Sequence, residues 1–117
     1  MPAQIAEDVD VLNEVRLVGR IPALSEEKVL PSGDTLRTFR VVIRRDPSAP
    51  SRQSVDSLEC VAWSGRVKRS VASWRPGDIV EVSGSLRRRF FRTAAGTGSR
   101  VEVEVTSARV LRRASTG

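Results

Sequence analysis

The chain has 117 residues, a length that fits one domain with a modest core. It has no histidine and one cysteine, which excludes an internal disulfide and an ordinary zinc site. The net charge is +6, no apolar run approaches the roughly 20 residues of a membrane-spanning helix, and the acidic first ten residues are not a signal peptide, so we expect a cytoplasmic protein.

The first third of the chain predicts an arm, a strand and a loop. Residues 1–10 are expected to form an N-terminal arm, and Val11 to Arg20 a first strand. The segment from Ile21 to Asp34 contains Pro22 and Pro31 and ends in a Ser-Gly-Asp turn. It therefore predicts a loop or a weak hairpin return.

A second strand is predicted from Thr35 to Arg45, because apolar and polar residues alternate along it. One face is expected to be buried and consists of Phe39, Val41 and Ile43. The opposite face carries arginines and can therefore line a groove. The following residues, 46–56, are rich in proline and serine and predict a long exposed loop.

A third strand is predicted from Ser57 to Ser64, and one helix follows it. Cys60 lies in an apolar run, so we expect a buried and inert thiol. The spacing of Val67, Val71 and Trp74 gives one apolar stripe, which places Trp74 in the core. A Pro-Gly pair at 76–77 ends the helix.

The last third predicts two strands joined by a flexible tip. The fourth strand runs from Ile79 to Leu86 and continues outward to Arg92. Thr93 to Ser99 is expected to be the hairpin tip, and Arg100 to Leu111 the final strand. In that strand Val101, Val103 and Val105 are predicted to face inward, and Glu102 and Glu104 outward.

Three strands, a helix and two more strands form the order expected of an all-β, five-stranded OB-fold Greek-key barrel, with one short helix between strands 3 and 4. We assign residues 11–113 to this nucleic-acid-binding domain and residues 114–117 to a short C-terminal end. Such barrels bind oligonucleotides across strands 2 and 3 and between loops.

The stretch from Gly84 to Arg92 places four arginines around Phe90 and Phe91. Arginine pairs with phosphate, and phenylalanine offers a face on which any base can stack, as in single-strand grooves. The competing interpretation is a hairpin edge with solvated arginines. Residues 1–34 carry seven acidic and three basic side chains, whereas residues 35–117 carry seven acidic and seventeen basic ones. This basic body favours a polyanionic partner, although a GC-rich genome alone can also favour arginine.

The chain resembles the bacterial single-stranded DNA-binding protein (SSB) family over roughly residues 12 to 112. The matching segments are Asn13–Arg20, Leu30–Gly33, Cys60–Trp63, Ala72–Gly77 and Asp78–Leu86. The resemblance implies an OB-fold that assembles, usually as a homotetramer, with single-stranded DNA wrapped over it. It also implies base stacking at the positions of Trp63 and Phe91, both aromatic here.

Two departures from the family pattern affect this expectation. Two further aromatics of the family are replaced here near Arg44, Arg45 and Ser57, so weaker binding is expected unless the arginines compensate. The family's acidic tail has no counterpart after Glu104, so tail-mediated recruitment of enzymes is not expected from this chain.

The predicted function is binding of single-stranded DNA with little sequence preference, protecting it during replication, recombination or repair at the bacterial nucleoid. No catalysis, cofactor or metal is expected. Phe91 is predicted to face the DNA, and Phe90 to pack on the barrel or a subunit interface. The predicted DNA-binding residues are Arg37, Arg40, Arg44, Arg45, Trp63, Arg87, Arg88, Arg89, Phe91 and Arg92.

Three alternatives stay open on the sequence alone. One is a replication-restart accessory of the primosomal type, also an OB-fold but usually dimeric. Another is a protein-interaction module whose basic face meets an acidic partner. The third is a small basic nuclease using carboxylates such as Glu102 and Glu104, for which salt-bridged or solvated surface is the stronger interpretation.

Overall fold

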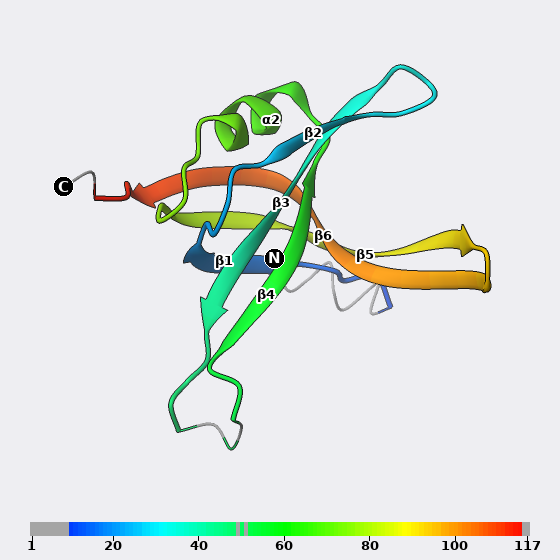
Figure 1. Ribbon diagram of the computed structural model, residues 1–117. Helices are drawn as coiled ribbons and strands as arrows, with labels where there is room; N and C mark the ends of the chain where they lie inside the picture. The colour runs from blue at the N-terminus through cyan, green and yellow to red at the C-terminus, as the bar shows by residue number, and fades with distance from the viewer. Residues whose placement is uncertain (1–9, 49, 51, 116–117) are drawn as a thin grey trace.

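The computed structural model describes residues 10–48, 50 and 52–115 (Figure 1). Within them, six strands and one helix follow in the order β1 (Val15–Arg20), β2 (Glu26–Val29), β3 (Thr35–Arg44), β4 (Val55–Ala62), α2 (Gly65–Ala72), β5 (Ile79–Thr93) and β6 (Gly96–Arg112). No helix in this part of the chain has the length and apolar character needed to cross a membrane.

The strands form one sheet that closes on itself. The strand order is β1-β5-β6-β4-β3-β2, and a further pairing of β1 with β3 at Arg20 and Val42 closes the barrel. All pairings are antiparallel except that of β4 with β6. A register shift at Ser83 and Gly84 bends β5 around the barrel, and a Cβ on Gly84 would overlap the carbonyl oxygen of Glu104. The predicted OB-fold barrel with one short helix is therefore confirmed, and β2 adds a sixth strand to the five that were predicted, so that the helix lies between β4 and β5.

The core lies between the barrel wall and the helix. Val41, Val71, Val80 and Val82 are fully buried. The N–H of Val67 donates to the hydroxyl of Ser64, which caps the helix and directs its apolar stripe inward. At the end of that stripe Trp74 is buried and meets Phe39 edge-to-face, with ring centres 5.5 Å apart. The prediction that Trp74 belongs to the core is confirmed.

Hairpins project from the barrel in Figure 1. One joins β2 and β3, and another joins β3 and β4. A third, which we call the arm, is the hairpin of residues 86–101 from β5 and β6. The predicted flexible tip from Thr93 to Ser99 is wrong, because pairing continues to Thr93 and Gly96 and leaves only a two-residue turn. Gly96, which directly follows the turn, has φ 129°, a left-handed backbone that favours glycine.

Other boundaries differ for local reasons. The first strand begins at Val15, and residues 10–14 are not strand; the rest of the predicted N-terminal arm lies outside the described residues. The segment from Ile21 to Asp34 adopts the hairpin return, in which β2 pairs with β3. Val101 is 46% exposed rather than inward-facing, because the arm extends beyond the end of the barrel.

The C-terminal segment is fastened to the turn after the helix. Asp78 is buried, and its carboxylate accepts hydrogen bonds from the backbone N–H groups of Arg75 and Ala114 and from the guanidinium of Arg113. These donors lower the pKa of Asp78, the backbone bond from Arg75 being the strongest cause. One carboxylate thus ties the end of β6 to the start of β5.

Candidate functional site

The two faces of the arm carry different side chains, because strand residues alternate in direction. Leu86 pairs with Val103, which is buried in the core, so Leu86, Arg88 and Phe90 share the face that continues the barrel interior. The opposite face, called here the outer face, carries Arg87, Arg89 and Phe91 on β5. Their partners on β6 are Glu102, Arg100 and Gly98.

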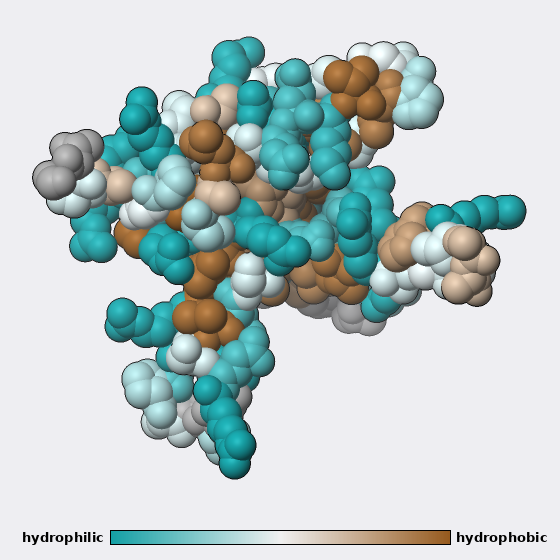
Figure 2. Space-filling model, viewed as in Figure 1, coloured by the Kyte–Doolittle hydropathy of each residue, from teal (hydrophilic) through white to brown (hydrophobic). Residues whose placement is uncertain are grey.

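A hollow of about 360 Å³ lies on the outer surface between β2, β3, β4 and β6. We call this hollow the groove. Charged side chains of both signs line it, namely Glu26, Lys28, Arg40, Glu59, Arg100 and Glu102. Less polar lining comes from the loop before β2, at Pro22, Ala23 and Leu24. Figure 2 shows hydrophilic side chains gathered between the β2–β3 hairpin and the arm.

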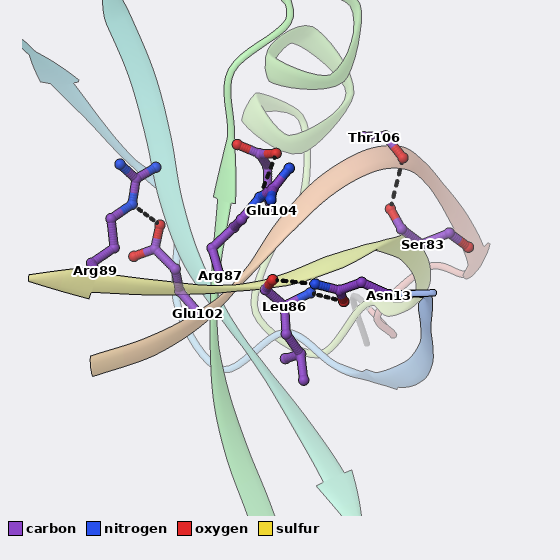
Figure 3. A network of polar contacts seen from close by, with 8 residues as sticks. All are labelled: Asn13, Ser83, Leu86, Arg87, Arg89, Glu102, Glu104 and Thr106. Carbon is purple, nitrogen blue, oxygen red and sulfur yellow. Dashed lines mark hydrogen bonds and ion pairs between the residues drawn. The ribbon is translucent and has the colours of Figure 1, made fainter. Parts of the chain in front are cut away.

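Ion pairs cross from the arm onto the barrel, as Figure 3 shows. Arg89 Nε lies 2.9 Å from a carboxylate oxygen of Glu102, and Arg87 Nε lies 3.2 Å from one of Glu104. The expectation that Glu102 faces outward is correct in direction, but its side chain is only 9% exposed because arginines cover it. Both carboxylates are thus held in salt bridges by arginines.

The arm is also anchored at its base. The side-chain N–H of Asn13 donates to the backbone carbonyl of Leu86, and the side-chain oxygen of Asn13 accepts from the backbone N–H of Leu86, both at 2.8 Å (Figure 3). This pair continues the β1–β5 ladder two residues beyond the pair of Val15 and Gly84, with which the ladder of β1 begins. Asn13 therefore fixes the point at which the arm leaves the barrel.

Trp63 directly follows β4, and Arg89 covers it. The guanidinium carbon of Arg89 is 5.3 Å from the centre of the Trp63 ring, a cation–π contact. The indole Nε1 of Trp63 is buried and, within the described part of the chain, has no hydrogen-bond partner. The residue as a whole is nevertheless only partly buried, so part of Trp63 remains accessible beside Arg89.

Phe91 is 42% exposed and rests on Gly98 across the hairpin. A Cβ built on Gly98 would lie 2.7 Å from Cε2 of Phe91, so the absence of a side chain there leaves room for the ring. Phe90 is 76% exposed on the other face. Of the two places predicted for Phe90, its own barrel is wrong, because the arm carries the ring past the barrel's end, and a subunit interface stays a prediction.

The structure brings about half of the predicted residues together. Arg40, Arg87, Arg89, Trp63 and Phe91 share the outer face, whereas Arg88 and Arg92 lie on the opposite face of the arm. Arg37 also turns away and donates to the backbone and hydroxyl of Ser25. Sequence reasoning missed Arg100, which becomes visible only once the register sets it opposite Arg89.

Arg44 and Arg45 lie at the far end of β3, beside a second hollow formed with residues 52–55. Arg45 Nη2 is 2.7 Å from a carboxylate oxygen of Asp56, and this hydrogen bond raises the pKa of Arg45. Arg44 is exposed, with no ion pair among the described residues. No group of three or more histidine, cysteine or acidic side chains in the described ranges is arranged to hold a metal ion.

The fold and sequence can be compared with known proteins. The family model for the single-strand binding protein family matches residues 12–112. Single-stranded DNA-binding protein 1 of Streptococcus agalactiae (serotype III, strain NEM316) is 27% identical over 88 residues, which cover 74% of this chain and 53% of that protein. Single-stranded DNA-binding protein A of Bacillus subtilis (strain 168) is 28% identical over 87 residues, covering 74% and 51%. The matched part thus spans about half the length of these relatives.

A solved structure described as the Plasmodium falciparum SSB complex with ssDNA has the same fold. The TM-score is 0.70 at 24% sequence identity, over 86% of this chain and 96% of that one. The match of the family model covers most of the chain, including all strands and the helix. This chain therefore belongs to the single-strand binding protein family.

Proposed function

We propose that this protein binds single-stranded DNA with little sequence preference and so protects it during replication, recombination or repair. Membership of the single-strand binding protein family supports this proposal, as do the names of the two bacterial relatives. The observation that carries it is the joint placement of Trp63 and Phe91 on the surface that also presents Arg40, Arg87, Arg89 and Arg100.

The mechanism is equilibrium binding without a chemical step. Arginines neutralise phosphates and release the counterions of the strand. Trp63 and Phe91 stack bases, a contact that each base can make because each has an aromatic face. No base edge has to be recognised, so sequence preference is slight. Arg37, Arg44, Arg45, Arg88 and Arg92 extend this set as secondary phosphate contacts outside the central face.

The binding unit is the barrel of residues 11–113, and we infer that it acts as a homo-oligomer, a tetramer before a dimer. A row of exposed apolar side chains on the inner face of the arm supports self-association, namely Leu86 (47% exposed), Phe90 and Val101. An apolar row of this kind is typical of an interface between subunits. With single-stranded DNA as the partner, the nucleoid in the bacterial cytoplasm is the expected location.

The test is a titration of labelled oligo(dT) followed by fluorescence anisotropy, in low and in high salt. If four arginines contact phosphates, the slope of log K against log salt is about −3, at roughly −0.7 per contact. Unlabelled oligo(dT) and oligo(dA) are expected to compete, and poly-glutamate of equal charge is not. Absence of binding in low salt, or equal competition by poly-glutamate, would reject DNA binding and favour a module that recognises an acidic protein.

A further inference from the structure

A row of alternating charges runs across the groove. It begins at Arg40 on β3, passes through Glu59, Arg100 and Glu102, and ends at Arg89 on the arm. The successive nitrogen–oxygen distances are 3.6, 4.0, 3.9 and 2.9 Å. Each carboxylate therefore lies between two guanidinium groups contributed by different strands.

The row ends on an aromatic ring. Arg89, held by Glu102, lies with its guanidinium carbon 5.3 Å from the centre of Trp63. A base that stacks on this face of Trp63 has to replace the guanidinium. The row thus occupies both kinds of contact that a nucleic-acid strand would make, the phosphate-binding cations and the stacking surface.

Carboxylate and phosphate use the same donors. Both accept paired N–H bonds from the planar guanidinium fork, so an anion already bound to an arginine competes with an incoming phosphate. Arg40 and Arg100 each keep 54% of the side chain exposed, whereas Glu102 keeps 9%. The arginines can turn toward a ligand, while Glu102 stays behind in the floor of the groove.

We propose that Glu59 and Glu102 act as internal competitors that occupy the groove arginines and Trp63 in the free protein and are displaced by the phosphates and bases of a bound strand. This inference rests on the proposed function and adds a determinant of affinity to it. The two carboxylates do not contact the strand favourably; they set how tightly, and with what salt dependence, the arginines hold it.

Two opposing contributions determine whether removal of a carboxylate tightens or weakens DNA binding. The carboxylates order the arginines, which helps binding, but any phosphate that binds also orders them. The negative charge remains in the groove of the complex and repels the strand. Exposed ion pairs contribute only about 0.2–1 kcal/mol each. Because each carboxylate pairs with two arginines, its replacement is expected to tighten binding by about 2- to 30-fold.

The experiment measures oligo(dT) affinity between about 50 and 200 mM salt for Glu59→Gln, Glu102→Gln and the double variant. Each replacement keeps the shape of the side chain and removes one charge. Each is expected to tighten binding in low salt and to make the salt slope steeper by about 0.7, which is one further phosphate charge neutralised. The double variant is expected to show roughly the sum of both changes.

Glu81→Gln is the matched control. Glu81 is likewise held by two arginines, Arg16 at 2.6 Å and Arg109 at 2.7 Å, but on the β1–β5–β6 side of the barrel. It lies six residues before Arg87 on β5, about 20 Å along the strand, well beyond the screening length of about 10 Å. The oligo(dT) affinity and the salt slope of Glu81→Gln are expected to equal those of the parent protein.

The outcomes separate this inference from the proposed function. If the parent protein fails to bind oligo(dT), both are rejected. If it binds but Glu59→Gln and Glu102→Gln bind no more tightly, or if Glu81→Gln gives the same gain, only the competition is rejected. Thermal unfolding checks that each variant is folded. If Glu102→Gln does not fold, Glu59→Gln alone tests the competition, because the Glu59 side chain is 35% exposed.

Discussion

The guanidinium carbon of Arg89 lies 5.3 Å from the centre of the Trp63 ring, so a side chain of the arm covers an aromatic face of the barrel. The two residues are 26 positions apart in the chain; Arg89 belongs to β5 and Trp63 directly follows β4, two strands that do not pair with each other. Arg89 also pairs with Glu102 in the groove, so the arm, the groove and Trp63 form one continuous surface.

Phe91→Ala is expected to weaken binding of oligo(dT) by about 5- to 150-fold, since loss of one stacked base amounts to about 1–3 kcal/mol. Phe90→Ala is the matched control, because it removes the adjacent ring from the opposite face of the arm. With an oligonucleotide short enough to occupy one subunit, Phe90→Ala is expected to bind with the affinity of the parent protein. The reverse ranking of the two variants would show that the faces have been assigned the wrong way round.

Gly98→Ala is expected to weaken binding through Phe91. The new methyl group would lie 2.7 Å from Cε2 of Phe91, which forces the ring to move. The loss is expected to be smaller than that of Phe91→Ala. In a Phe91→Ala background, Gly98→Ala is expected to have no further effect on affinity, because the two act through one contact. An additive loss in the double variant would contradict this explanation.

Asp78→Ala is expected to lower the free energy of unfolding by about 1–3 kcal/mol, because it leaves buried N–H groups without an acceptor. Asp34→Ala, in the exposed turn before β3, is the control and is expected to change the free energy of unfolding by less than about 0.5 kcal/mol. Since folding lowers the pKa of Asp78, the carboxylate stabilises the fold above its unfolded pKa of about 3.9. Thermal unfolding should therefore show a constant difference from the parent at neutral pH that shrinks as the pH falls below about 4.

Cys60 is expected to resist thiol reagents while the protein is folded. Burial first, and then the charges of Glu102 and Glu59, raise the pKa of its thiol to about 12, so hardly any reactive thiolate is present at pH 8. Ellman's reagent is expected to modify it only after addition of denaturant. Rapid modification of the native protein would mean that β4 opens readily at this point.

The barrel could be predicted because its strands have one buried face. Alternation placed Phe39 and Val41 inward, and helical spacing placed Val67 and Val71 against them; both pairs are buried. These patterns depend only on the period of each element and on the burial of apolar side chains, which are properties of the local sequence.

The site was harder to predict because it depends on register. A slip of one residue between β5 and β6 would move Arg89 to the other face, and the register is fixed by the irregularity at Ser83 and Gly84 and by the tight turn before Gly96. No local pattern reveals that Arg100 lies opposite Arg89, or that Glu102 is covered. Arg37 differs for a related reason: its strand face was visible in the sequence, but Ser25, which holds it, was not.

Quenching of tryptophan fluorescence by oligo(dT) is the most direct test of the central claim that Trp63 and the surrounding arginines bind single-stranded DNA. Trp63 is the expected reporter and the buried Trp74 is expected to stay silent, so Trp63→Phe serves as the comparison. We expect strong quenching in low salt that weakens in high salt and disappears in Trp63→Phe, although that variant still binds labelled oligo(dT). No quenching of the parent protein in low salt, or equal quenching in Trp63→Phe, would contradict that claim.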